Sequence, residues 1–262
     1  DGSFNAEKQA YGIEKVIASL DFQINGDSKG AINLNVLGGI LDRNFADASH
    51  KFIYAPITAA DGNVWLNNNL GANYSNANHI EYDPTQQATS YFDHHAFGSI
   101  FQWGRYSDGH ELITHTASNS RSAINGSTSI NATTDTPGNS LYITETGLPR
   151  DWRIPQNDAL WQGEAGTNNP CPNGYRVPTS VEFTTMVTAE NITDLTTASS
   201  SSLALARGAI RSSGGTLSSG NRYYLSTVTG DNSDYYRFDG LGSPILEDVN
   251  RANGGTVRCI KQ

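Results

Sequence analysis

Short runs of alternating apolar and polar residues recur along the chain, separated by Gly, Asn, Asp and Ser. Alternation over residues 31–37, with a turn signal at Gly26-Asp27, predicts a strand or hairpin within the first 55 residues. Residues 56–66 predict two short strands around Asp61-Gly62, a dipeptide that favours a tight hairpin turn. Further strands are predicted at residues 222–229, 235–239 and 255–260. The dominant pattern is that of short antiparallel strands.

Two segments have helical spacing instead. Over residues 91–105 apolar side chains recur mostly every three or four positions, which predicts an amphipathic helix with a buried aromatic face that ends at Gly104. Thr179 or Ser180, followed by Glu182, predicts the start of a second helix that runs to about Glu190. Residues 114–145 are rich in Ser, Thr, Asn and Gly and predict a long surface insertion.

Composition narrows the classes of partner. The 262 residues carry a net charge of −9 and only 16% are charged, with no basic run, so nucleic acid and anionic membranes are poor partners. We expect no membrane insertion, because no stretch approaches the ~20 apolar residues that a spanning helix needs. The first residues lack a signal-peptide pattern, so we expect an internal piece of a longer protein. The expected division is a strand-rich leader or end of a preceding module at 1–55 and a ligand-binding domain at 56–262.

Catalytic patterns are weak, and we expect no enzyme. Neither G-x-S-x-G nor H-E-x-x-H occurs, and the histidine pair His94-His95 and the separate His110 lack zinc-ligand spacing. Carboxylate pairs such as Asp151 with Asp158 carry no spacing that would define a glycosidase mechanism. Solvated surface charges are the better interpretation of those pairs.

A calcium site is predicted in the loop Gly230-Asp231-Asn232-Ser233-Asp234. The side chains of Asp231, Asn232 and Asp234 offer three oxygen ligands within four residues, and a hard cation such as Ca²⁺ prefers such ligands. No Lys or Arg occurs from Leu225 to Tyr236 to neutralise them. The alternative is a solvated polar turn.

Aromatic and arginine side chains are further candidates for ligand binding, since Trp, Tyr and Arg dominate binding energies at interfaces. Two tryptophans and an arginine lie in an irregular polar segment, and two tyrosine pairs lie in predicted strands, where one member of each pair should face outward or into a cleft. Core packing is the alternative for each of them. The candidate ligand contacts are Trp152, Arg153, Trp161, Tyr223, Tyr224, Tyr235 and Tyr236.

The two cysteines are too far apart in sequence for a zinc knuckle or a C-x-x-C redox pair. Cys171 and Cys259 are either joined in a disulfide or present as two separate buried thiols. If joined, they close a loop of about 88 residues, for which chain entropy gives on the order of 4 kcal/mol.

Five ordered motifs resemble a known family. They are GNVWLNNNLGA (62–72), FQWGR (101–105), CPNGYRVPT (171–179), YYLST (223–227) and VRCI (257–260). Together they resemble the Fibrobacter succinogenes major paralogous domain, a family of secreted modules related to the C-type lectin fold, over roughly residues 56–262. The chain also resembles the peptide-binding domains of calcium-dependent RTX adhesins of Gram-negative bacteria.

The resemblance implies an α+β, C-type-lectin-like domain with short antiparallel sheets, two helices and long loops. It places the protein outside the cell, on a Gram-negative surface, as the non-enzymatic ligand-binding module of a large adhesin. It also favours a Cys171–Cys259 disulfide and Ca²⁺ as cofactor. The implied ligand is a peptide or protein on a target cell, held through its C-terminus. A calcium-dependent carbohydrate-binding (lectin) module is the alternative, and a structural spacer is a third interpretation.

Overall fold

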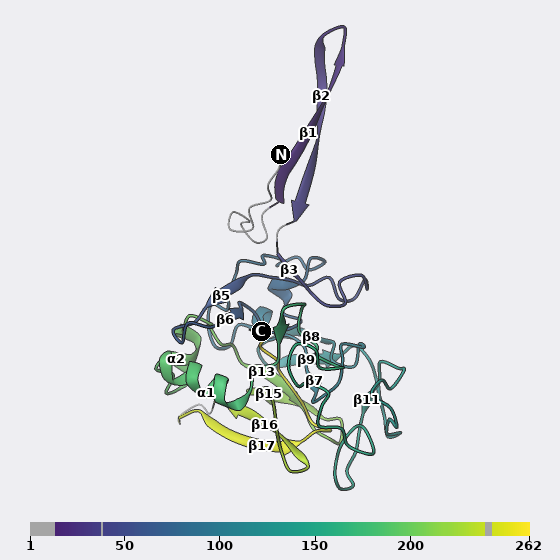
Figure 1. The fold of residues 1–262 in the computed structure, drawn as a ribbon, viewed down its shortest axis with the longest axis vertical. Helices are drawn as coiled ribbons and strands as arrows, with labels where there is room; N and C mark the ends of the chain where they lie inside the picture. The colour runs from purple at the N-terminus through teal and green to yellow at the C-terminus, as the bar shows by residue number, and fades with distance from the viewer. Residues whose placement is uncertain (1–13, 38, 239–242) are drawn as a thin grey trace.

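The computed structural model describes residues 14–37, 39–238 and 243–262. The predicted N-terminal hairpin is confirmed: β1 (Glu14–Ile24) and β2 (Asp27–Leu37) pair antiparallel. The turn between them is Asn25-Gly26, where both residues have positive φ (54° and 85°), a conformation that Gly and Asn tolerate best. Figure 1 shows this hairpin projecting away from the rest of the chain.

The rest of the chain folds into many short strands. Their bounds are β3 (Ile40–Leu41), β4 (Ile53–Tyr54), β5 (Pro56–Thr58), β6 (Val64–Leu66), β7 (Phe101–Gln102), β8 (Ile113–Ala117), β9 (Ser120–Ala123), β10 (Ser127–Thr128), β11 (Tyr142–Ile143), β12 (Tyr175–Arg176), β13 (Gly208–Arg211), β14 (Leu217–Gly220), β15 (Arg222–Thr229), β16 (Asn232–Arg237), β17 (Ile245–Asn250), β18 (Gly254–Gly255) and β19 (Ile260–Lys261). Residue 239, the last of the strand predicted at 235–239, lies outside the described residues.

These strands form small separate sheets. Three have the orders β12-β19-β6-β5, β14-β13-β18-β7 and β15-β16-β17, and β3–β4, β8–β9 and β10–β11 are pairs. All pairings are antiparallel except β10–β11. The predicted hairpin around Asp61-Gly62 is confirmed by β5 and β6, and the last strand, β19, lies beside β6. The C-terminal strand thereby pairs with a strand from near the start of the expected domain.

The predicted fold class is wrong, because the described chain is β-rich rather than an α+β, C-type-lectin-like domain. Its α-helices are α1 (Ser180–Ala189) and α2 (Leu195–Ser200). The predicted helix at 91–105 does not form: a 3₁₀ turn, η3 (His94–Ala96), is followed by strand β7. Gly98 and Gly104 have φ of 78° and 76°, outside the helical region, and an added Cβ at Gly98 would lie 2.4 Å from Leu70 O. The helix-like spacing therefore arises from an irregular segment folded into the core.

The second predicted helix is confirmed as α1. The Thr179 side chain accepts a hydrogen bond from Glu182 N, and the Glu182 carboxylate accepts one from Thr179 N, forming a capping box. Helix α2 lies in a segment rich in Ser and Thr, where Asp194 and Thr197 form a second capping box. A further 3₁₀ turn, η2 (Asn73–Ser75), lies between β6 and η3 in the chain.

Two main apolar clusters lie on opposite faces of the β15–β16 pair. Tyr224 and Tyr235 belong to one cluster, with Trp103, Trp161 and the disulfide, whereas Tyr223 and Tyr236 belong to the other, with Trp65, Phe183 and Met186. Both faces of this pair are therefore buried. Phe52 and Tyr54, which precede the expected domain boundary at Pro56, also lie in the first cluster.

The disulfide between Cys171 and Cys259 is confirmed, with the two Cα atoms 5.9 Å apart. It links the turn before β12 to the segment before β19, inside the first apolar cluster. Among the helices of the described residues, none has the length and apolar character needed to cross a bilayer.

Candidate functional site

The structure places most of the predicted ligand contacts in the core. Trp152 and Trp161 are fully buried, and their Nε1 atoms donate to the carbonyl oxygens of Trp103 (2.7 Å) and Arg105 (3.3 Å). One tyrosine of each pair is expected to face outward or into a cleft, and none faces outward, since Tyr223, Tyr224, Tyr235 and Tyr236 are all buried. The reason is that apolar clusters cover both faces of β15 and β16. A direct ligand contact by these residues stays a prediction.

Arg153, the remaining predicted contact, lies nearer the surface. Its Nε is 2.7 Å from the Asp135 carboxylate, whose side chain is about one-third exposed. Asn157 Nδ2 donates to the same carboxylate oxygen at 3.0 Å. Arg153 therefore holds the Asp135 carboxylate, which lines a surface depression together with Tyr106, Asp108 and the rest of loop 135–140.

The three predicted calcium ligands lie at the β15–β16 turn and in β16. Asp231 is exposed, and its backbone carbonyl accepts a hydrogen bond from Gln156. Asp234 accepts a hydrogen bond from the Thr229 hydroxyl at 2.7 Å and lies directly opposite Asp248 of β17. Asn232 donates to the Asp248 carboxylate. Asp248 of β17 thus lies beside Asn232 and Asp234, whereas Asp231 is an exposed residue of the turn.

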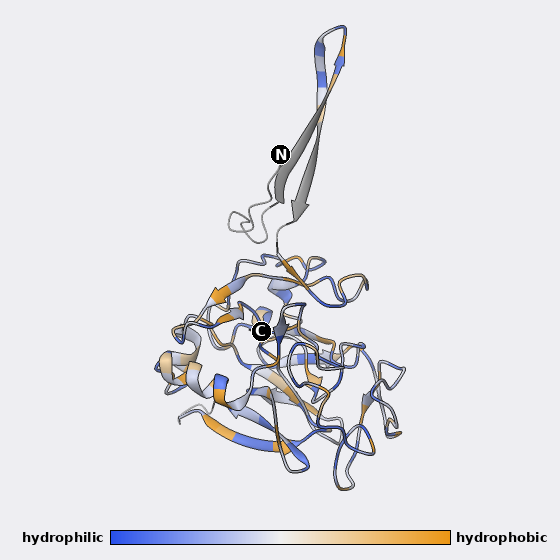
Figure 2. Cartoon of the chain, in the orientation of Figure 1, coloured by the Kyte–Doolittle hydropathy of each residue, from blue (hydrophilic) through white to orange (hydrophobic). Residues whose placement is uncertain are grey.

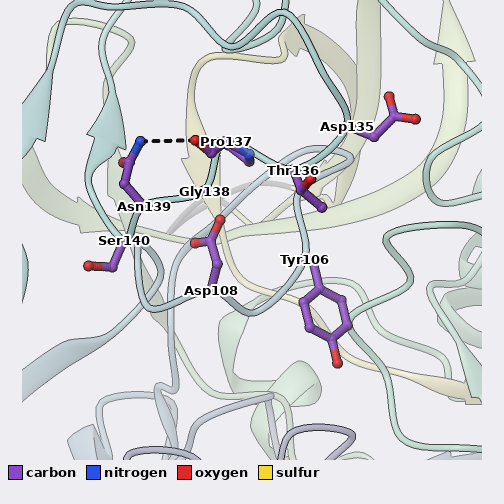
Figure 3. A pocket seen from close by; sticks show the side chains of 8 residues that line it. All are labelled: Tyr106, Asp108, Asp135, Thr136, Pro137, Gly138, Asn139 and Ser140. Carbon is purple, nitrogen blue, oxygen red and sulfur yellow. Dashed lines mark hydrogen bonds between the residues drawn. The ribbon is translucent and has the colours of Figure 1, made fainter.

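An open depression of about 390 Å³ lies between Tyr106, Asp108 and the loop 135–140. Figure 3 shows the loop side chains arranged around Asp108 and Tyr106. Its lining residues are Tyr106, Asp108, Asp135, Thr136, Pro137, Gly138, Asn139 and Ser140. Gly138 has a φ of 73°, and Asn139 Oδ1 accepts a hydrogen bond from Leu141 N, so this loop turns sharply and is held locally. The lining offers an aromatic ring, hydroxyls, an amide and two carboxylates.

A buried charge network supports the floor of this depression. The Asp108 carboxylate contacts Arg105 Nε at 2.8 Å and His110 Nδ1 at 2.7 Å. Glu111 is buried and contacts His50 Nε2 at 2.7 Å, Gly109 N at 2.9 Å and His110 Nδ1 at 3.2 Å. Arg105 also donates to the carbonyl oxygens of residues 139 and 141. The network therefore ties the 108–111 turn to the far wall of the depression.

Burial and hydrogen bonding shift the pKa values in this network in opposite directions. Burial by itself would raise the pKa of Glu111, but hydrogen bonds from His110 and His50 outweigh it and lower the pKa to about 2. Burial raises the pKa of Asp42, which lies near His50 and Glu111, to about 6 despite a hydrogen bond from Asn44 N. At neutral pH Glu111 is firmly ionised.

Asp108, His110 and Glu111 bring one potential metal-ligating atom each within 4.8 Å of one another. A set that includes a histidine nitrogen does not suit Ca²⁺, which prefers oxygen ligands. His110 Nδ1 lies between the two carboxylates, at 2.7 and 3.2 Å, and already hydrogen-bonds to them. The arrangement is that of an internally hydrogen-bonded network, in which Gln102 N also donates to His110 Nε2.

The segment that forms the depression also exposes aliphatic side chains. Leu148 is 88% exposed and Ile130 is 77% exposed, and Leu141 and Ile154 are also exposed. Ile154 N donates to Ala132 O, which holds this end of the segment beside residue 132. Figure 2 shows that the loops in this part of the chain are mostly hydrophilic, with scattered hydrophobic residues.

Comparison with protein-family models, curated proteins and solved structures finds no match for this chain. Function must therefore be argued from the site itself. The Pro137-Gly138 dipeptide is a turn signal that marks the depression loop in the sequence. Tyr106 carries no such signal, because its place beside residues 135–140 depends on the tertiary fold.

Proposed function

We propose that this protein is a non-enzymatic recognition module of the kind found in bacterial surface adhesins. Its ligand is a peptide or protein, which it binds by the C-terminus of that ligand. The observation that carries the proposal is the joint placement of a polar depression and exposed aliphatic side chains on one loop segment, residues 130–154. Aliphatic contacts around a few oriented polar groups are typical of protein and peptide interfaces. The five-motif resemblance supports the same interpretation.

Binding is favoured over catalysis by the state of the acid and base groups beside the depression. Both Asp108 oxygens are engaged by Arg105 and His110, and Asp135 is engaged by Arg153 and Asn157. A general base must instead reach a substrate proton with a free lone pair. The groups left for a ligand are the Tyr106 ring, the hydroxyl and amide groups of the loop, and the second oxygen of Asp135, since Arg153 and Asn157 both contact Oδ1. Most of these groups favour recognition over reaction.

Carbohydrate binding is the second candidate, favoured by the depression itself. A tyrosine ring beside Thr136, Asn139 and Ser140 offers a surface for a sugar ring and partners for its hydroxyl groups. Aliphatic side chains such as Leu148 and Ile130 contribute nothing to that recognition. The peptide proposal accounts for both features, so it ranks first.

Calcium dependence is part of the proposal. Asp234 and Asp248 place two carboxylates directly opposite each other on adjacent strands, an arrangement that is repulsive without a cation. Asn232 now donates its amide N–H to Asp248, and rotation of this amide would add its oxygen to the two carboxylates, giving an all-oxygen donor set of the kind that suits Ca²⁺. We expect EGTA to weaken ligand binding, measured by isothermal titration, and an Asp234→Ala, Asp248→Ala double variant to bind equally with and without EGTA. Unchanged affinity of the wild type in EGTA would remove calcium from the proposal.

The decisive test screens the purified chain against a C-terminal peptide library and a glycan array in parallel. We expect peptide binders, with binding weakened at least about tenfold by Thr136→Trp, which fills the depression. Thr133→Trp is the matched control, since Thr133 is also exposed on this segment but does not line the depression. Binding to glycans alone would select the second candidate, and silence on both arrays would favour a structural spacer.

A further inference from the structure

Two arginines lie together on the surface without a carboxylate partner. Arg121 is on β9, and Arg207 immediately precedes β13. Arg121 NH1 donates to Ser219 Oγ at 2.8 Å, and Arg207 NH1 donates to Asn119 Oδ1 at 3.2 Å. Ser219 Oγ lies 3.5 Å from the same Asn119 oxygen, so a chain of neutral groups joins the two guanidinium groups. We call Ser118, Asn119, Arg121, Arg207 and Ser219 the arginine surface.

The chain is acidic overall, with 26 Asp and Glu residues against 17 Lys and Arg residues, and about half of its described arginines pair with a carboxylate. The paired arginines are Arg43, Arg105, Arg153, Arg176, Arg237 and Arg251. Within the described ranges, no carboxylate lies within 4.0 Å of the guanidinium nitrogens of Arg121 or Arg207. Two cations that are linked through Asn119 and Ser219 and lack a carboxylate partner offer a binding site for an anion.

The pKa values of Arg121 and His115 reflect the positive charge of this surface. Partial burial lowers the pKa of Arg121, and the positive charge of Arg207 lowers it further. His115 lies opposite Arg121 across the β8–β9 pair. Burial lowers the pKa of His115 to about 4, and the charge of Arg121 contributes to the decrease, although a hydrogen bond to Gly98 O opposes it. His115 is therefore neutral at pH 7 and adds no charge, so the positive field comes from the two arginines.

An apolar contact lies beside the charged groups. Phe92 is 51% exposed, and the Arg207 guanidinium carbon lies 5.6 Å from the centre of its ring. Ser118 Oγ donates to Phe92 O at 2.6 Å, and Arg121 NH2 donates to Ser118 O at 2.8 Å, so the ring and both arginines are held on one framework. A ligand that carries a carboxylate next to an apolar side chain matches this pattern.

We propose that the arginine surface binds the terminal carboxylate of the peptide ligand, with the last side chain against Phe92. This inference deepens the proposed function and rests on it for the identity of the ligand. A carboxylate can offer one oxygen to each guanidinium group, and because arginine also binds sulfate and phosphate, inorganic sulfate is the competing anion in the test. Asn125, four residues after Arg121, donates to Gly109 O next to Asp108, so the same stretch of chain leads to the depression.

A direct test uses N-acetylglycine, a peptide C-terminus reduced to its carboxylate, and its amide as the uncharged control. The arginine Nε–Hε signals are followed by NMR and assigned with Arg121→Lys and Arg207→Gln. We expect N-acetylglycine to shift the Arg121 and Arg207 signals saturably and the amide to leave them unchanged. Absence of a shift overturns the inference, as does saturation by inorganic sulfate without an effect of N-acetylglycine.

The peptides selected from the C-terminal library give the second arm. We expect Arg207→Gln to raise their dissociation constant by roughly tenfold, the effect of losing a charge-assisted hydrogen bond, and amidation of the peptide to do the same. Lys261→Gln is the charge-matched control, because Lys261 is exposed on β19 and lies outside segment 130–154. Thermal unfolding confirms that each variant is folded.

The two arms separate the failure of this inference from that of the proposed function. Peptides that bind Arg207→Gln and the wild type equally would overturn the carboxylate site and leave peptide recognition standing. A saturable N-acetylglycine shift without any library binder would support the carboxylate site and overturn the proposed peptide ligand.

Discussion

Replacing Glu111 by Gln should destabilise the protein strongly at neutral pH and weakly in acid. The carboxylate is buried and contacts His50 Nε2, Gly109 N and His110 Nδ1 at 2.7, 2.9 and 3.2 Å. Its pKa falls from 4.5 to about 2, because the hydrogen bonds from the histidines outweigh the effect of burial. At ~1.4 kcal/mol per pH unit, this corresponds to about 3 kcal/mol of unfolding free energy.

The sign of the pH dependence follows from the direction of the shift. A carboxylate whose pKa is lowered by folding stabilises the native state above its unfolded pKa of 4.5, and that stability is lost as pH falls toward 2. The Glu111→Gln variant lacks this titrating group. The difference in unfolding free energy between wild type and variant should therefore shrink by about half between pH 7 and pH 3.

Urea unfolding followed by tryptophan fluorescence at several pH values measures this, since all four tryptophans are buried. Glu81→Gln is the matched control, because Glu81 is exposed and its loss should leave stability nearly unchanged at every pH. A Glu111→Gln deficit that is the same at pH 7 and pH 3 would refute the assignment of this stability to the ionised carboxylate.

Three further predictions concern stability. Asp42→Asn should raise the unfolding free energy by about 1 to 3 kcal/mol at pH 8 and leave it unchanged near pH 4. The reason is that burial raises the pKa of Asp42 to about 6, so its ionised form disfavours the folded state above that pH. Urea unfolding at both pH values checks this, and an equal effect at both would contradict it. Replacing Cys171 and Cys259 by Ser should cost on the order of 4 kcal/mol, measured by denaturant unfolding, whereas thiol alkylation of the unreduced wild type detected by intact mass would show that the bond is absent. Thr179→Ala should lower stability by about 1 kcal/mol through loss of the capping box of α1, with the exposed Thr185→Ala as control, and equal Tm values for the two variants would argue against the cap.

The sequence by itself determined features that depend on near neighbours along the chain. The hairpins around residues 26 and 62 follow from turn dipeptides flanked by alternating residues, and the start of α1 follows from Thr179 and Glu182, because each is set by hydrogen bonds within a few residues. The pairing of the two cysteines needed more than spacing, and family resemblance supplied it.

Only the tertiary structure decided which side chains are available to a ligand. Alternation along β15 and β16 predicts an exposed tyrosine in each pair, but apolar clusters packed on both faces bury all of them, and a strand's sequence does not reveal what covers its second face. The spacing over residues 91–105 indicates a helix, yet backbone packing of Gly98 against Leu70 forces an irregular path. The depression beside Tyr106 and the Arg121–Arg207 pair join residues about 30 and 86 positions apart, so their chemistry depends on long-range contacts that no local pattern records.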